Sequence, residues 1–336
     1  MPMNNPFDDA AFSMSELTAA INILPNNYGL VGQLGLFRPK PTRTRQISIE
    51  ENNGVLNLLP TRAPGTPGTV GKSGKRKLRG FNIPHIPHDD VVLPEEVQGV
   101  RAFGSENQIQ ALSDIITEHL QAMRNKHAIT LEHLRMGALK GIILDSDGSE
   151  LLNLYDEFEI TPKSINFALS NAATDVKKKC LDVKRHIEKN LLGEVMTNVS
   201  VLVSPEFFDA LTSHAKVKEA YERWREGQAL RDDMRDGFPF GGLIFKEYLG
   251  EASDGDGNIR RFIAANEGHA FPMGTQETFR TYFAPADFNE TVNTLGKPIY
   301  VKQASRKFER GTDIHTQSNP LPMCHRPAVL VKLTNT

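Results

Sequence analysis

Apolar and polar residues alternate along the first quarter of the chain in a way that predicts one short helix followed by strands. Residues 13–24 place apolar side chains at helical spacing, with Ser13 or Ser15 as the N-cap. From 30 to 85 the pattern is that of strands and loops, and an Asn-Gly pair at 53–54 favours a tight hairpin turn. The stretch KLRGFNIP supplies the returning strand, so we expect a long two-stranded excursion that needs a packing partner.

The strongest helical signal covers residues 105–136. Ser105 and Gln108 have the spacing of a capping box, and apolar residues then recur every three or four positions. A continuous helix of this length would extend about 45 Å, which is unusual in a globular protein. The alternative is an ordinary core helix that breaks near Asn125. Either helix would have a structural role.

The rest of the chain mixes both periodicities, which predicts the α+β class. We expect a hairpin that turns at 145–148, a helix over 168–194 and a buried strand over 199–204. A helix from Ser204 to Trp224 should follow. After it we expect a second hairpin, which turns at 254–257 between strands 241–250 and 259–266, and mostly extended chain after His269.

Charge is unevenly distributed in a chain that is nearly neutral overall. The 336 residues carry a net charge of −2 at pH 7, and 39% of them are hydrophobic, enough for a sizeable core. Residues 38–80 contain ten basic and two acidic side chains, a local charge of +8, so the remainder carries −10. Such segregation suits complementary contacts between copies of the chain, and a nucleic-acid-binding arm is the competing interpretation.

The cysteines and the apolar segments exclude several classes of protein. Cys180 and Cys324 are too few for a disulfide framework or a thiolate metal site, which fits a reducing cytosol. No stretch approaches about 18 uninterrupted apolar residues, so we expect no membrane span. The N-terminus lacks the basic start and apolar core of a signal peptide, and we expect the protein to be intracellular when made.

The stretch GTPGTVGKSGKRK, residues 65–77, nearly matches a phosphate-binding loop. Thr66 occupies the position of the required first glycine, and prolines stand where a buried strand should lead into the loop. We interpret the stretch as a cationic, glycine-rich loop tip that contacts neighbouring subunits. The basic residues assigned to this contact are Arg62, Lys72, Lys75, Arg76, Lys77 and Arg79.

Two further motifs resemble metal sites without completing one. His85, His88, Asp89 and Asp90 lie close together, but Pro87 prevents the helical spacing of a zinc pair, so an extended connector is the preferred interpretation. The stretches DSDGS and DGDGN resemble the opening of calcium loops, yet neither continues to the glutamate that completes one. We interpret both as hairpin turns and expect no metal and no cofactor.

Catalytic signatures are missing from the sequence. It contains no G-x-S-x-G elbow, no dinucleotide-binding fingerprint after a strand, and no known nucleophile motif around either cysteine. We therefore expect a protein that is not an enzyme.

Five blocks between Phe81 and Leu333 carry a family resemblance. They are FNIPHIPHDDVVLPEEVQGVRAFG, HAITLEHLRMGALKGIILDSDGSELLNLYDEF, VLVSPEFFDALTSHAKVKEAYERW, FRTYFAPADFNETVN and QSNPLPMCHRPAVLVKL. In this order they resemble the lambda-type major capsid protein E family of tailed bacteriophages, whose members have the HK97-like fold.

The resemblance implies a subunit of four parts. It places an N-terminal arm at 1–29, an extended β-hairpin loop (E-loop) at 30–85, a P-domain at 86–160 with a spine helix at about 105–137 and a β-hairpin, a mixed α/β A-domain at 161–295, and strands at 296–336 that return to the P-domain and the A-domain edge. The basic tip at 65–77 then corresponds to the end of the E-loop, which in this fold lies across an adjacent subunit.

The resemblance also implies a function and a set of partners. The protein would be a structural protein that self-assembles into hexamers and pentamers, and these would form an icosahedral head around double-stranded DNA, contacted non-specifically. It would be found in the virion, after assembly in the host cytoplasm, with a portal and a possible cement protein. Because the chain begins directly with the arm, we expect a separate scaffold protein. No motif supports transferring to Lys72, Lys75 or Lys77 the covalent cross-link of some relatives.

A DNA-binding protein that uses the basic loop 62–79 against phosphate groups is the alternative function. Such a protein should bind in a salt-sensitive way and should interleave aromatic residues with the charges. The loop contains no aromatic residue, which favours the capsid interpretation.

Overall fold

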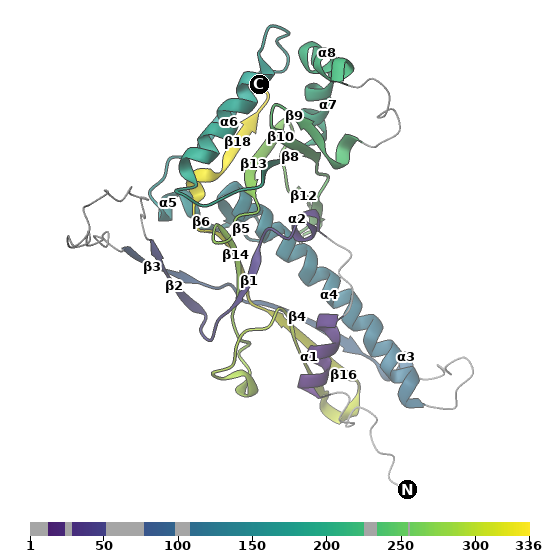
Figure 1. Cartoon of the computed structure of the whole chain (residues 1–336). Coiled ribbons are helices and arrows are strands. Elements are labelled where there is room, and N and C mark those ends of the chain that lie inside the picture. Colours follow the sequence, from purple (N-terminus) through teal and green to yellow (C-terminus); the bar gives the residue numbers. More distant parts are fainter. Residues whose placement is uncertain (1–12, 24–28, 52–76, 98–107, 225–233, 255) are drawn as a thin grey trace, which may run out of the picture.

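A long helix, α4, links a lower region built on a three-stranded sheet to an upper region built on a six-stranded sheet (Figure 1). The computed structural model describes residues 13–23, 29–51, 77–97, 108–224, 234–254 and 256–336. The helices are α1 (Met14–Ile23), α2 (Leu30–Gln33), α3 (Pro94–Val97), α4 (Gln108–Lys140), α5 (Leu154–Glu157), α6 (Val176–Asn190), α7 (Pro205–Ser213) and α8 (Ala215–Trp224). The strands are β1 (Arg38–Pro41), β2 (Gln46–Glu51), β3 (Lys77–Asn82), β4 (Ile86–Val92), β5 (Ile142–Leu144), β6 (Glu150–Asn153), β7 (Lys163–Asn166), β8 (Asn198–Val203), β9 (Phe238–Phe240), β10 (Leu243–Glu247), β11 (Glu251–Ser253), β12 (Ile259–Arg261), β13 (Glu267–Met273), β14 (Phe279–Phe283), β15 (Tyr300–Ser305), β16 (Thr312–Ser318), β17 (Pro320–Cys324) and β18 (Val331–Thr334).

Helix α4 spans 33 residues, so the prediction of one continuous helix is confirmed and a break near Asn125 is wrong. At about 1.5 Å per residue the helix is about 50 Å long. It ends before Gly141, whose φ of +84° is the left-handed conformation that commonly terminates helices. A Cβ atom at Gly141 would lie 2.3 Å from the ring of Tyr155, so the close approach also requires glycine. The predicted capping box at Ser105 lies outside the described residues.

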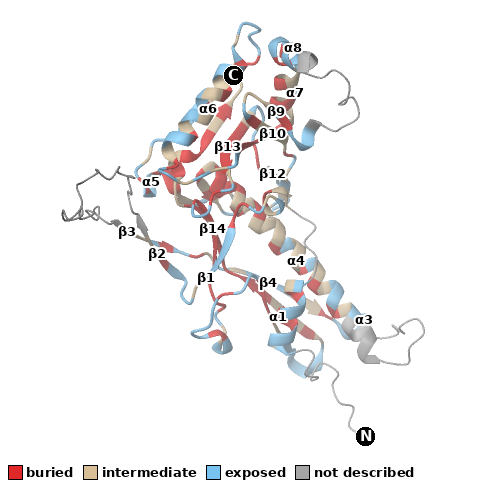
Figure 2. Ribbon diagram, in the orientation of Figure 1, coloured by how far each residue is buried: buried red, intermediate tan, exposed pale blue. Residues whose placement is uncertain are grey.

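The upper sheet has the strand order β7-β18-β13-β8-β10-β9. Strand β8 is the predicted buried strand and lies inside the sheet, antiparallel to β13 and parallel to β10. Helix α6 turns Val176, Cys180, Val183 and Ile187 inward at helical spacing. Figure 2 shows that buried residues concentrate in this sheet and on the inner faces of the helices beside it. This region contains most of the core.

Both helices predicted for this region differ in length from those observed. The one expected over 168–194 is α6, which begins at Val176 because the side chain of Asp175 caps it and the preceding residues form turns. The one expected to run from Ser204 to Trp224 begins as predicted, with the Ser204 hydroxyl accepting from Phe207 N–H. It divides into α7 and α8 because the residue between them has extended backbone, with ψ 127°.

The hairpin that turns at 254–257 is confirmed, and so is the start of its second strand at Ile259, but its first strand is not the one predicted. The turn joins β11 to β12, which pair antiparallel. The residues expected to form one arm of this hairpin are in β10, which pairs instead with β8 and β9. Strand pairing inside the main sheet has therefore overridden the local hairpin pattern.

The lower sheet has the order β15-β16-β4 and packs against α1 and α4. The prediction of α1 is confirmed, and Ser13 Oγ accepts from Glu16 N–H at 3.5 Å, as the N-cap does. The hydroxyl of Thr18 accepts from Val301 N–H at 3.1 Å, which fixes α1 to the edge strand β15. A second, smaller apolar core that includes Ile21 fills the space between these elements.

Between the two regions, the third sheet has the order β1-β14-β17. Strand β1 runs parallel to β14, so the chain near residue 40 belongs to this sheet rather than to the hairpin excursion. The short helix α2 in the same stretch was also not predicted. The returning strand of the excursion is confirmed, because β3 pairs antiparallel with β2. The turn expected at 53–54 lies outside the described residues.

The buried His127 and His269 and the half-buried His325 all have lowered pKa values, and this predicts sensitivity to acid. Burial lowers the pKa of His127 to about 4, that of His269 to about 3 and that of His325 to about 4. The unfolded chain, with histidine pKa near 6.5, binds protons that the folded chain does not. We expect the free energy of unfolding to fall between pH 6.5 and 4 by about 1.4 kcal/mol per pH unit for each histidine. Urea midpoints at several pH values measure this slope, and His269→Asn should reduce it. A midpoint constant from pH 7 to pH 5 would contradict the prediction.

Candidate assembly surfaces

Strands β2 and β3 project from the body and form the base of the expected E-loop (Figure 1). Ile47 and Phe81 are directly opposite each other in the pair, and both are buried. The ring of Phe81 stacks on that of Phe158, which follows α5, with centroids 6.1 Å apart. The base of the hairpin is therefore fixed to the body by aromatic packing.

The basic residues assigned to subunit contact fall at and beyond the end of this hairpin. Arg62, Lys72, Lys75 and Arg76 lie outside the described residues, and Lys77 opens β3. The guanidinium of Arg79, in the same strand, is 5.3 Å from the centre of the Phe158 ring, a cation–π contact within the chain. Their part in contacts between subunits stays a prediction.

A buried carboxylate on α4, that of Glu132, joins three segments that the sequence patterns did not connect. The residue is 3% exposed, and its oxygens accept from Val31 N–H at 2.7 Å, Gly32 N–H at 3.0 Å and the Tyr248 hydroxyl at 3.0 Å. Helix α2 and the chain after β10 are thereby tied to α4. Burial, together with the neighbouring Glu132, raises the pKa of Tyr248, so its hydroxyl remains the donor.

Gly29 and Arg135 complete this junction around Glu132. Gly29 has φ +106°, and a Cβ there would lie 2.5 Å from Glu132 Oε2, so both the backbone and the space require glycine. Burial lowers the pKa of Arg135, partly offset by the charge of Glu132, and its guanidinium is 6.0 Å from the centre of the Phe37 ring. An acidic residue within the apolar stripe of a predicted helix is the signal that could have revealed this junction.

Near the other end of α4, His119 is held between two carboxylates. Its Nδ1 is 2.7 Å from Asp90 of β4 and its Nε2 is 2.9 Å from Glu96 of α3, so both ring nitrogens donate. Partial burial alone would lower the pKa of His119, but the hydrogen bonds to the two carboxylates and their charges outweigh it and raise the pKa. The imidazolium connects α3 and β4 to the long helix.

Residues 86–90 belong to strand β4 and His85 directly precedes it, as the extended interpretation predicted, and their side chains have separate partners. His88 Nε2 is 3.1 Å from Lys126 Nζ, whereas Asp89 pairs with His315 of β16. Among the described residues, no group of three or more His, Cys, Asp or Glu side chains is arranged to hold a metal ion.

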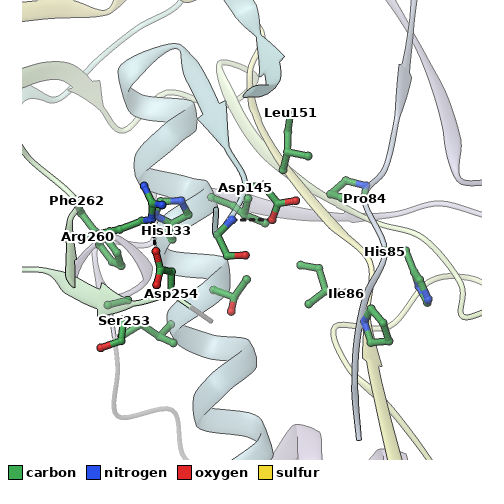
Figure 3. A pocket seen from close by; sticks show the side chains of 16 residues that line it. Pro84, His85, Ile86, His133, Asp145, Leu151, Ser253, Asp254, Arg260 and Phe262 are labelled. Atoms are coloured by element: carbon green, nitrogen blue, oxygen red, sulfur yellow. Dashed lines mark hydrogen bonds and ion pairs between the residues drawn. The ribbon is translucent and has the colours of Figure 1, made fainter. Parts of the chain in front are cut away.

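A cavity of about 280 Å³ lies where α4 meets the two Asp-rich hairpin turns (Figure 3). Asp145 and Ser146 come from the β5–β6 turn, and Asp254 and Arg260 come from the β11–β12 hairpin. The apolar side chains that line it are Ile86, Ile129, Leu134, Leu151, Ala252 and Phe262. We name it the junction cavity.

Arg260 holds the two turns together at the rim of this cavity. Its Nε donates to the Asp254 carboxylate at 3.0 Å and its Nη2 donates to the Asp147 carbonyl at 2.7 Å. The Asp254 carboxylate also accepts from the N–H groups of Asp256 and Asn258, so hydrogen bonds within the chain occupy it. The interpretation of DSDGS and DGDGN as hairpin turns is confirmed.

The two cysteines are packed in the core and are unsuited to nucleophilic chemistry. Cys180 and Cys324 are both fully buried, and burial raises the pKa of each thiol to about 12. Of the helices within the described part of the chain, none is both long and apolar enough to cross a membrane.

Solved phage structures share this fold. The putative capsid protein of an E. coli CFT073 prophage superposes with a TM-score of 0.64 at 14% identity, covering 96% of this chain and 99% of that one. The capsid protein of Myoviridae phage XM1 gives a TM-score of 0.51 at 11% identity, with 94% and 95% covered. The long helix, projecting hairpin and mixed sheets therefore define the HK97-like class of phage capsid proteins.

Sequence relatives narrow the class to one family. Residues 13–335 match the model of the family described as phage major capsid protein E. The major capsid protein of Pseudomonas phage KPP10 is 31% identical over 339 residues, and that of Salmonella phage Felix O1 is 28% identical over 355, each with 96% of both chains covered. The chain belongs to the phage major capsid protein E family.

The family membership confirms the predicted role. The protein is a structural, non-enzymatic protein that forms a multi-subunit capsid shell, and it is part of the virion. A soluble DNA-binding role for loop 62–79 is not supported.

Proposed function

We propose that this chain assembles as hexamers and pentamers that close an icosahedral head around double-stranded DNA. The observation that carries the proposal is the β2–β3 hairpin, which projects from the body and whose described residues pack against it through Ile47 and Phe81 at the base. An isolated two-stranded hairpin is marginal in water, so a projecting one gains stability from an adjacent subunit. Weak contacts of this kind, repeated over a closed symmetric lattice, produce a stable shell.

The same proposal divides the chain into functional parts. Residues 1–29 would be the arm, 30–85 the E-loop together with the segment of α2 and β1 that leads into it from the body, 86–160 the P-domain, 161–295 the A-domain, and 296–336 the strands that return to both. The lower sheet with its own small core and the upper sheet with the main core support a division into two packed regions joined by α4.

The basic E-loop tip would contact an acidic surface of the neighbouring subunit. Support comes from the charge distribution, since residues 38–80 carry +8 and the remainder of the chain −10. Opposite charges on two surfaces speed docking and fix its orientation. We further propose non-specific contact with the enclosed DNA, a separate scaffold protein, a portal, a possible cement protein, and assembly in the host cytoplasm.

Negative-stain microscopy of the protein, expressed with and without the neighbouring phage head genes, tests the proposal. Uniform shells, or free hexamers and pentamers, are the expected result. A monomer that forms neither under both conditions would overturn it.

A further inference from the structure

Of the large apolar side chains among the described residues, one at a hairpin tip is the most exposed. Phe308 lies in the turn between β15 and β16 and is 86% exposed. Its backbone is in the left-handed region (φ 63°, ψ 23°), and the next residue, Glu309, also has positive φ. That conformation is rare and costly for a bulky side chain, and it often marks functional positions. Within the described part of the chain, the ring is left almost entirely uncovered.

The residues around Phe308 are basic. Arg306, Lys307 and Arg310 surround it in sequence, and the Arg310 guanidinium is 5.7 Å from the centre of its ring. Arg306 also pairs with Asp313 at 2.6 Å, which fixes one side of the turn. With Glu309 included, residues 306–310 carry a charge of +2. The chemistry that fits this tip is an apolar cavity with an acidic rim.

The junction cavity has these properties. Its 280 Å³ exceeds the roughly 150 Å³ that holds a benzene molecule, and half of its sixteen lining residues are apolar, Ile129, Leu134 and Phe262 among them. Asp145 and Asp254 line it, but the Asp254 carboxylate is buried against Arg260. The acidic side chains available at the rim are therefore the exposed Asp145 and its neighbour Asp147 in the same turn. Leu151, on one wall, is 42% exposed. The hydrogen bonds of Arg260 hold the rim in place before any partner arrives.

The tip cannot reach the cavity of its own subunit. Ile86 lines the cavity and pairs with Ser318, whereas the tip follows Ser305 and precedes Thr312, which pairs with Val92. Six residues of strand separate the two ends, about 20 Å at about 3.3 Å per residue. A contact between them must therefore join two copies of the chain.

We infer that Phe308 of one subunit inserts into the junction cavity of another, with its basic neighbours against the acidic rim. The inference rests on the proposed function and names one of its intersubunit contacts. The two surfaces differ, so the contact is heterologous and propagates through a ring or lattice. An aromatic side chain in a pocket, next to complementary charges, is the usual composition of an interface hot spot.

Cross-linking between singly substituted subunits tests the contact. One variant carries Lys307→Cys and retains Phe308, and the other carries Ser146→Cys at the rim. Both native cysteines are fully buried, so a thiol-specific cross-linker should act at the introduced residues. We expect linked dimers from assembled mixtures of the two variants, and at least tenfold fewer when Phe308→Ala is added to the first. Lys307→Cys mixed with Val195→Cys, which is exposed in the upper region, serves as the matched control.

Each outcome bears on the inference. Two results would overturn this contact and leave the proposed function standing. One is particles that form without any cross-linked dimers. The other is a yield of cross-linked dimers that is unchanged by Phe308→Ala or no higher than that of the Val195→Cys control. If the unsubstituted chain forms no particles under the microscope, the proposed function fails, and this contact fails with it. In addition, Phe308→Ala should raise the subunit concentration needed for assembly by more than about tenfold, while circular dichroism remains unchanged.

Discussion

Replacing Glu132 by alanine is expected to lower the free energy of unfolding by about 3–5 kcal/mol. The substitution leaves the N–H groups of Val31 and Gly32 and the Tyr248 hydroxyl without their acceptor in a buried site. Each such group costs about 1–3 kcal/mol when unsatisfied. It also removes the negative charge beside the buried Arg135. Urea denaturation of the unassembled subunit at neutral pH measures the loss.

Glu118→Ala is the matched control for this substitution. It removes the same side chain from the same helix at an exposed position, where the change should stay within about 0.5 kcal/mol. Glu132→Gln should fall between the two, because the amide retains one acceptor oxygen. A Glu132→Ala subunit as stable as the control would show that water replaces the carboxylate at little cost and that the junction does not anchor α2.

Reversing the charge of Lys72, Lys75 and Arg76 together to glutamate is expected to abolish closed particles while leaving the subunit folded. These residues precede β3, so the hairpin base with its packing of Phe81 on Phe158 remains. The substitutions turn the electrostatic attraction between the tip and an acidic surface of the neighbouring subunit into repulsion. Like-charge contacts cost several kcal/mol at an interface. Light scattering and negative-stain microscopy of DNA-free samples measure assembly.

Lys178, Arg185 and Lys189 on α6, all exposed, provide a control with the same change of net charge. Normal particles from this triple variant, beside none from the E-loop variant, would assign the effect to the tip. If both variants fail alike, overall charge governs assembly and the E-loop contact is wrong. If both assemble without DNA but only the E-loop variant packages poorly, the tip contacts DNA instead.

The elements that could be predicted from the sequence are those whose own residues specify them. Helix α4 has a sustained apolar period, α1 and α7 have serine caps, and the Asp-Gly turns impose hairpins wherever their strands pair. The family resemblance worked for a similar reason, because its blocks coincide with these strongly patterned segments.

The elements that could not be predicted depend on contacts between distant residues. Helix α2 has four residues, too few to be stable alone, and exists where Glu132 accepts from its first N–H groups. Strand β10 joins β8 across about 40 residues of intervening chain, which no local pattern encodes. The junction cavity likewise requires two hairpins more than 100 residues apart to meet through Arg260.

Because α4 is one unbroken helix, a rotation at one of its ends displaces the other end. Glu132 fixes it near the upper region and His119 fixes the lower elements to its far part, so the two ends cannot bend independently. Over a helix of about 50 Å, a tilt of about 5° at one end displaces the other by about 4 Å. Small angular differences at the upper anchor would thus become larger shifts in subunit spacing at the periphery, and the proposed hexamers and pentamers would need such a shift to form from one sequence without refolding.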